Sequence, residues 1–173
     1  MKGRLFSLIM AFALVFSIPS YASELTWGGV PGHHNQSILL ENGEIFSRDE
    51  VRGNARGEIL ASGMSEISNE QNGTLHIEIT TFAHRNMDAI YQSVYLERWD
   101  EKRGDWVQIN SWDFERTKEE EENLSAYSVG FTVYGLTVGE YYRVRGLHMV
   151  ELNGEFEGIA TETNGVKLTK VSY

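Results

Sequence analysis

Three tryptophans near the middle of the chain are the side chains best suited to hold a ligand. Trp99, Trp106 and Trp112 flank the turn-forming residues Lys102-Arg103-Gly104 in the stretch ERWDEKRGDWVQINSW. Facing outward from two strands, they would form an aromatic platform that stacks on a sugar ring or packs against a partner. Facing inward, they would belong to the core, where aromatic cross-strand pairs stabilise sheets. Both strands carry apolar residues on both faces, so the alternation leaves the two interpretations open, with packing favoured.

The same stretch contains Arg103-Gly104-Asp105, a tripeptide known from adhesion ligands. Gly104 lies where the chain must reverse between two alternating segments, and glycine and aspartate are ordinary turn formers. No other part of the sequence points to an integrin partner. We therefore interpret the tripeptide as the bend of a hairpin.

The five histidines do not have the spacing of a metal site. His33 and His34 are adjacent in a glycine-containing segment, which makes a poor preformed site. His76 and His84 would lie about 26 Å apart along a strand, too far to share one ion. His148 shares its strand parity with apolar neighbours, so we expect it in the core. We predict no metal and no cofactor.

Catalytic patterns are also missing from the sequence. It has no cysteine nucleophile and no Gly-x-Ser-x-Gly elbow. The acidic run Glu119–Glu122 lacks the glycine and asparagine spacing of a calcium loop, so we expect a solvated loop. A chance pair of carboxylates for sugar hydrolysis is the least favoured alternative. We predict that the protein is not an enzyme.

The first 22 residues have the pattern of a secretory signal peptide. Lys2 and Arg4 precede the apolar run Leu5–Ile18, and Ser20-Tyr21-Ala22 supplies small residues for cleavage near Ala22. The apolar run is shorter than the ~20 residues needed to span a bilayer. We therefore predict a secreted protein with no membrane span after cleavage.

The charge and the lack of cysteine narrow the expected partners and source. Without the two positive charges of the leader, the net charge is (15 − 2) − 25 = −12. Such a chain repels phosphates, so we expect no nucleic-acid partner. A secreted chain without disulfides must be stabilised by its core. This composition favours a bacterial exporter, and a Gram-positive one in particular.

The pattern of apolar and polar residues changes near Gly57. Residues 23–56 have no sustained period and contain Gly28-Gly29 and Pro31-Gly32, so we predict a loosely ordered arm. Residues 57–173 contain alternating segments separated by turn signals such as Asn153-Gly154. We expect seven strands, roughly at 58–68, 74–84, 89–100, 105–116, 125–134, 140–152 and 155–168. Because no helix covers them, two sheets must pack face to face, and we predict a single all-β, seven-stranded antiparallel β-sandwich.

The stretch GLTVGEYYRVRGLHMV is similar to a segment of immunoglobulin-like domains. Leu136, Gly139, Tyr142 and Val144 match the spacing Leu-x-x-Gly-x-x-Tyr-x-Val found before the sixth strand of fibronectin type III domains. In those domains the tyrosine forms a corner, in which its hydroxyl bonds back to the upstream backbone. The resemblance implies an immunoglobulin- or fibronectin type III-like sandwich with Tyr142 at the corner.

The chain also resembles an uncharacterised family of small secreted proteins of Gram-positive bacteria, a domain of unknown function. The residues that carry this resemblance are Arg56–Ile67, Val94–Trp112 and Tyr141–Val150. It extends roughly from Arg56 to the C-terminus. The resemblance implies secretion and a sandwich fold, and it implies no catalytic activity.

These observations favour a secreted, non-enzymatic β-sandwich module. We expect it to act by surface recognition of a protein partner in the envelope or outside the cell. The alternative is a carbohydrate-binding module that uses the aromatic platform of Trp99, Trp106 and Trp112 to hold a polysaccharide. The fold alone does not decide between them, because sandwiches support many functions.

Overall fold

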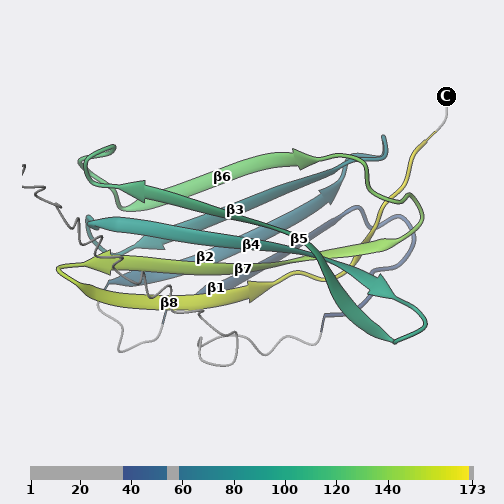
Figure 1. Cartoon of the computed structure of the whole chain (residues 1–173), viewed down its shortest axis with the longest axis horizontal. Coiled ribbons are helices and arrows are strands. Elements are labelled where there is room, and N and C mark those ends of the chain that lie inside the picture. The colour runs from purple at the N-terminus through teal and green to yellow at the C-terminus, as the bar shows by residue number, and fades with distance from the viewer. Residues whose placement is uncertain (1–36, 54–58, 172–173) are drawn as a thin grey trace, which may run out of the picture.

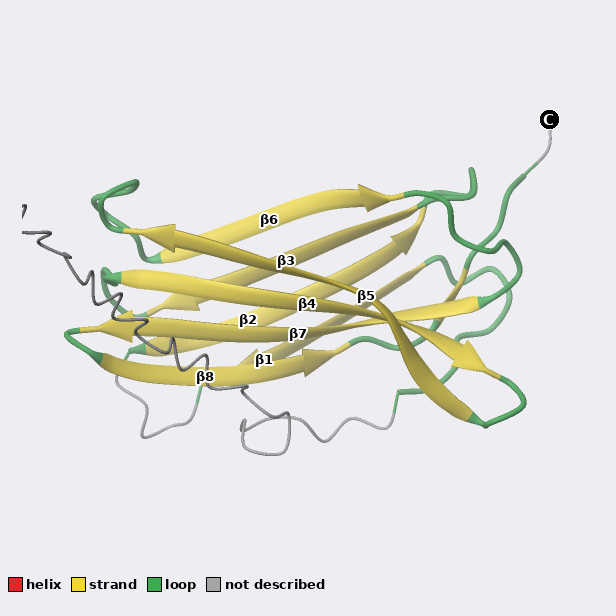
Figure 2. Cartoon of the chain, in the orientation of Figure 1, coloured by secondary structure: helices red, strands yellow, loops and turns green. Residues whose placement is uncertain are grey.

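The computed structural model describes residues 37–53 and 59–171. The predicted signal peptide, the His33-His34 pair and the first part of the predicted arm lie outside the described residues. The described residues form nine strands and no helix (Figure 2). The strands are β1 (Phe46–Arg52), β2 (Leu60–Asn69), β3 (Leu75–Ala83), β4 (Ala89–Asp100), β5 (Asp105–Thr117), β6 (Ala126–Val133), β7 (Tyr141–Leu152), β8 (Glu155–Glu162) and β9 (Val166–Lys167).

Two antiparallel sheets lie face to face (Figure 1). The four-stranded sheet has the order β1-β2-β3-β6, and the five-stranded sheet has the order β5-β4-β7-β8 with β9 beside β7. The chain therefore changes sheets between β3 and β4, between β5 and β6, and between β6 and β7. This is an immunoglobulin-like arrangement built from β2 to β8, with β1 added at one edge. The predicted β-sandwich is confirmed, and its seven expected strands correspond to β2–β8.

Strand β1 corrects the prediction for residues 23–56. Phe46–Arg52 pairs antiparallel with β2 over its whole length, so this part of the predicted arm is not loosely ordered. Its inward side chains are Ser47, Asp49 and Val51, and two of these three are polar. The segment therefore lacks the alternating apolar pattern by which a strand is recognised in a sequence.

Side chains of β1 also close one side of the sandwich. Ser47 Oγ accepts a hydrogen bond from the backbone N–H of Asn164 at 2.9 Å, and Asp49 Oδ2 accepts one from Glu162 at 2.7 Å. Nearby, Leu39 forms a parallel bridge with Gly165. Backbone donors at the end of β8 and just beyond it are thus satisfied from the opposite sheet, which protects an edge that would otherwise be exposed.

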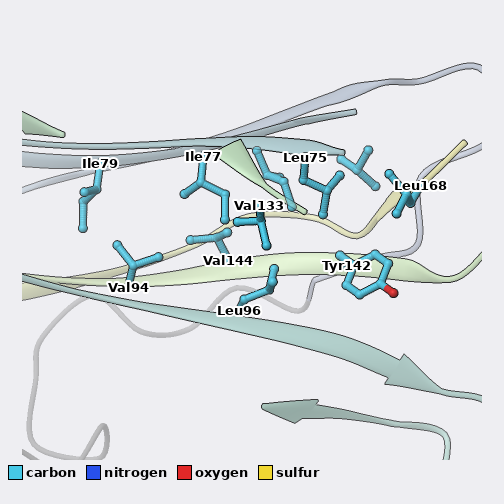
Figure 3. Packing of buried hydrophobic residues seen from close by; sticks show 11 residues of the cluster. Leu75, Ile77, Ile79, Val94, Leu96, Val133, Tyr142, Val144 and Leu168 are labelled. Carbon is cyan, nitrogen blue, oxygen red and sulfur yellow. The ribbon is translucent and has the colours of Figure 1, made fainter. Parts of the chain in front are cut away.

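The core lies between the sheets (Figure 3). Leu75, Ile77 and Ile79 of β3 are fully buried, as their shared parity predicts. They face buried residues of the other sheet that include Val94 and Val144. The interior of the sandwich is therefore filled by the inward-facing side chains of strands in both sheets.

Tyr142 forms the expected tyrosine corner at the edge of this core. Its ring is almost completely buried. Its hydroxyl donates to the carbonyl oxygen of Thr137 at 3.1 Å and accepts from the Thr137 N–H at 3.0 Å. The loop between β6 and β7 is thereby fixed to the start of β7.

Candidate binding surface

A β-bulge determines where the tryptophans of the β4–β5 hairpin lie. The register of the two strands shifts between Leu96 and Glu97, which pair with Asn110 and Gln108. Ile109 is therefore the extra residue of β5. Because one additional residue reverses the parity of side chains, Trp106 and Trp112 point to opposite faces of the sheet.

Trp99 and Trp106 lie together on the outer face, whereas Trp112 points into the sandwich. The first two form a cross-strand pair whose ring centroids are 5.4 Å apart at an interplanar angle of 67°. The ring centroid of Trp112 is 4.8 Å from that of Phe131 on the opposite sheet. The three residues predicted as a ligand site thus do not form one platform.

The ring of Trp106 is already engaged by other parts of the chain. The guanidinium carbon of Arg143 lies 4.6 Å from its centroid, which is a cation–π distance. A Cβ atom at Gly165 would lie 2.6 Å from the same ring. Trp106 therefore packs directly over the backbone of Gly165, and only a residue without a side chain fits there.

Next to Trp106, four charged residues form an ion-pair network on the outer face. Arg143 donates from Nε to Glu97 and from Nη1 to Glu162, each at 2.7 Å. The second oxygen of Glu97 lies 3.0 Å from Nε of Arg145. Two positive and two negative charges are thus paired although their side chains are largely buried. Sequence analysis did not single out these residues, because their pairing depends on the order β4-β7-β8.

The same outer face carries a group of apolar side chains on β4, β7 and β8, beside the polar pair of Ser93 and Asp113. Tyr91 of β4 lies opposite Met149 of β7, and Leu147 of β7 lies opposite Ala160 of β8. Leu147 and Ala160 form a small buried cluster of their own. We use the name outer patch for these residues and their neighbours on the same face: Tyr91, Tyr95, Leu147, Met149, Phe156 and Ala160.

The phenol of Tyr91 connects the outer patch to the carboxylate of Glu151. Its hydroxyl donates a hydrogen bond to Glu151 Oε2 at 2.9 Å. Burial and this carboxylate raise the pKa of Tyr91 to about 12. The hydroxyl therefore stays protonated at neutral pH, and the ring presents an uncharged surface.

The outer face of the four-stranded sheet has a different character. At its centre Glu66 pairs across the strands with Glu78. Arg48 forms an ion pair with Glu66 at 3.2 Å, and Ser128 donates to Glu78 at 3.0 Å. The centre of this face is therefore charged and polar, in contrast to the outer patch.

The Arg103-Gly104-Asp105 segment forms the predicted bend. The N–H of Gly104 donates to the carbonyl oxygen of Asp100 at 2.8 Å, and Gly104 has a φ of 62°. This left-handed conformation favours glycine. Asp105 continues into β5, where its carboxylate accepts the N–H of Trp106 at 2.8 Å.

His148 lies in the core, as its parity predicts. Its two ring nitrogens lie 2.9 Å from Thr81 Oγ1 and 3.0 Å from Thr161 Oγ1. Thr161 also bonds to Ser65, and Gln92 donates to Thr81. Burial lowers the pKa of His148 to about 3, so the imidazole is neutral at physiological pH. The cluster is a polar layer between the sheets in which both ring nitrogens of His148 have partners, whereas Gln92 Oε1 has none among the described residues.

Two further features bear on the function of residues 37–53 and 59–171. Within these ranges no group of three or more histidine, aspartate or glutamate side chains converges in the way that metal ligands do. No helix in the described part of the chain is long and apolar enough to cross a membrane.

The fold and these surfaces define an immunoglobulin-like β-sandwich with two chemically different outer faces. A family of unknown function, DUF6147, matches residues 35–166, well over half of the chain. The chain belongs to this family. The match begins before β1, so the matched residues include the strand that sequence patterns missed. No curated protein matches the chain.

Proposed function

We propose that the protein is a non-enzymatic binding module that recognises a protein partner through the outer patch. The supporting observation is the contrast between the two outer faces. One presents the half-buried side chains of Tyr91, Tyr95 and Met149 and the exposed side chain of Phe156, and the other has Glu66 and Glu78 at its centre. Paired antiparallel strands present both surfaces, one on each sheet, so the difference lies in the side chains and not in the scaffold.

The outer patch has the composition of a protein interface. Interface centres are enriched in aromatic residues and methionine and depleted in charge, while their rims are polar. Tyr91, Tyr95 and Met149 supply the centre, and Phe156 adds a side chain that is 55% exposed. The Arg143–Glu97 network and Glu151 supply charges at the border. All of them lie on paired strands, so little ordering is needed on binding.

Export is part of this proposal. We propose that the leader-like residues 1–22 direct export and that the protein meets its partner in the envelope or outside the cell. The formal charge, −10 for the full chain and (15 − 2) − 25 = −12 without the leader, favours a partner with a basic surface around its contact region, because complementary potentials speed association.

The carbohydrate-binding alternative has less support at the platform of Trp99, Trp106 and Trp112 than the protein-binding proposal has at the outer patch. Trp112 packs against Phe131, and Trp106 packs against Arg143. Of the three tryptophans, Trp99 alone remains as a candidate stacking residue.

Lysine substitutions on the two outer faces test the proposal. Phe156→Lys and Met149→Lys place charge in the outer patch, whereas Phe82→Lys changes an exposed phenylalanine on the other face. Immobilised protein is titrated with extracellular and envelope proteins of the producing cells, and saturable binding is measured. We expect both outer-patch variants to weaken binding at least tenfold and Phe82→Lys to leave it unchanged. Equal binding by all three variants, or no saturable binding by the unmodified protein, contradicts the proposal.

A further inference from the structure

We propose that a cleft at the tip of the β4–β5 hairpin binds a neutral saccharide. The hairpin twists away from the rest of its sheet (Figure 1). Between its tip and the start of β7 lies a cleft of about 430 Å³. That volume is within the range of small-ligand sites, roughly 300–1,000 Å³. Its lining residues include Arg98, Trp99, Asp100, Lys102, Glu140 and Tyr141.

Two aromatic residues, Trp99 and Tyr141, line this cleft. The pairing of β4 with β7 ends at Arg98 and Tyr142, so Trp99 and Tyr141 are the next residues along the two strands. Trp99 is supported by the edge-to-face contact with Trp106. Lys167 Nζ lies 5.6 Å from the ring centroid of Tyr141. Contacts within the protein thus restrain both rings before any ligand arrives, which lowers the entropic cost of binding.

The polar side chains of the cleft supply both donors and acceptors. Asp100 Oδ1 accepts the backbone N–H of Lys102 at 3.0 Å and that of Arg103 at 3.3 Å. These bonds fix the carboxylate through one of its two oxygens. The side chain of Arg98 makes no hydrogen bond or ion pair with another described residue, although its charge acts on the Tyr142 hydroxyl, so its guanidinium can donate to a ligand in the cleft.

The charges of the cleft select against other ligand classes. Two cations, Arg98 and Lys102, face three anions, Asp100, Glu101 and Glu140, which gives 2 − 3 = −1. A phosphate or a uronate would be repelled. A wholly apolar ligand would desolvate five charged groups without replacing their hydrogen bonds. A neutral sugar has C–H groups on one face for the aromatic rings and hydroxyl groups around its edge for the charged side chains.

This cleft is separate from the outer patch, and the two proposals stand or fall independently. None of the residues that line it is a member of the outer patch. It also differs from the platform of Trp99, Trp106 and Trp112, because Tyr141 takes the place of the two other tryptophans. The pairing of β4 with β7 brings Tyr141 next to Trp99, although the two residues are far apart in the sequence.

Calorimetric titration of the purified protein tests the proposal with cellohexaose, xylohexaose, chitohexaose and laminarihexaose as neutral probes. Hexagalacturonate is the anionic probe. We expect at least one neutral hexasaccharide to bind and hexagalacturonate to bind at least tenfold more weakly than that sugar. Tyr141→Ala and Trp99→Ala should each weaken binding at least tenfold. Tyr134→Ala is the matched control, because Tyr134 is 74% exposed and does not line the cleft.

If the loss of an aromatic ring prevents folding, the variant Lys102→Ala still tests the cleft, because Lys102 is an exposed turn residue. It should weaken sugar binding severalfold and leave the melting temperature unchanged. Three results would each overturn the proposal: no heat with any neutral probe, preferred binding of hexagalacturonate, or equal losses in the Tyr134→Ala and cleft variants.

Discussion

Among single residues, His148 makes the interior of the sandwich sensitive to acid. Burial lowers its pKa from 6.5 to about 3 in the folded protein. Between these values the unfolded chain binds a proton that the folded chain does not. Above about pH 6.5 neither state binds this proton, so His148 does not lower the free energy of unfolding. As the pH falls from 6.5 toward 3, proton binding by the unfolded chain lowers the free energy of unfolding progressively.

We predict that His148 alone makes the free energy of unfolding fall by about 1.4 kcal/mol per pH unit between pH 6 and pH 4. Urea unfolding at several pH values measures the slope, and His148→Gln provides the reference for the contribution of carboxylates. The slope of the variant should be shallower by that amount. As a second measure, the NMR signal of the His148 Hε1 proton should not shift between pH 7.5 and pH 4.5 in the folded protein. Parallel pH slopes, or titration of His148 near pH 6.5, would contradict this prediction.

Gly63 is required because it leaves room for the His148 ring. A Cβ atom at Gly63 would lie 2.5 Å from the imidazole, which cannot move without breaking its bonds to Thr81 and Thr161. We expect Gly63→Ala to lower the free energy of unfolding by about 1–3 kcal/mol, the usual cost of overpacking. Gly130→Ala is the control, since its nearest neighbour would be 3.4 Å away. Denaturant unfolding of both variants checks this, and equal stabilities would show that the ring is not tightly enclosed.

At the scale of strands, the sequence predicts an element well where apolar residues alternate. Strand β3 is an example, because Leu75, Ile77 and Ile79 all face inward. Strand β1 lacks this alternation, because the polar residues Ser47 and Asp49 occupy inward positions. Their side chains accept hydrogen bonds from the backbone at and beyond the end of β8. The order of β1 depends on a sheet edge that is formed by residues more than a hundred positions later in the chain.

The candidate site was less predictable than the fold for a similar reason. The bulge at Ile109 has no glycine or proline to mark it, yet it moves Trp112 from the face of Trp106 to the core. The outer patch depends on the order β4-β7-β8, which places Tyr91, Met149 and Gly158 side by side. Neither relation can be read from the alternation within one strand.

The role of β1 can be tested by removing it. A chain that begins at Gly57, the boundary that sequence patterns suggest, lacks the ladder with β2 and the bonds to Glu162 and Asn164. We predict that it melts at least 10 °C lower than a chain that begins at residue 35, or does not fold cooperatively, because buried backbone donors lose their partners. Thermal melts followed by circular dichroism measure the difference. Identical melting temperatures would mean that β1 is an accessory and not part of the domain.

At the scale of the whole molecule, the two open sides of the sandwich are closed by different chemistry. Polar side chains of β1 bond to the backbone at the end of β8 on one side. Aromatic rings close the other side, where Trp112 and Phe114 of β5 both contact Phe131 of β6. With both sides closed, the two outer faces are the broad surfaces that remain for binding. One of them carries the outer patch.

Site-specific photocrosslinking in the producing cells tests the proposed recognition most directly. A benzoylphenylalanine is placed at Phe156 in the outer patch or at Phe82 on the opposite face, two exposed positions of the same residue type. The account predicts a discrete crosslinked protein from position 156, no such product from position 82, and loss of the product when Met149→Lys is added. A product from position 82 alone, or none from position 156, would contradict the assignment of the outer patch as the recognition surface.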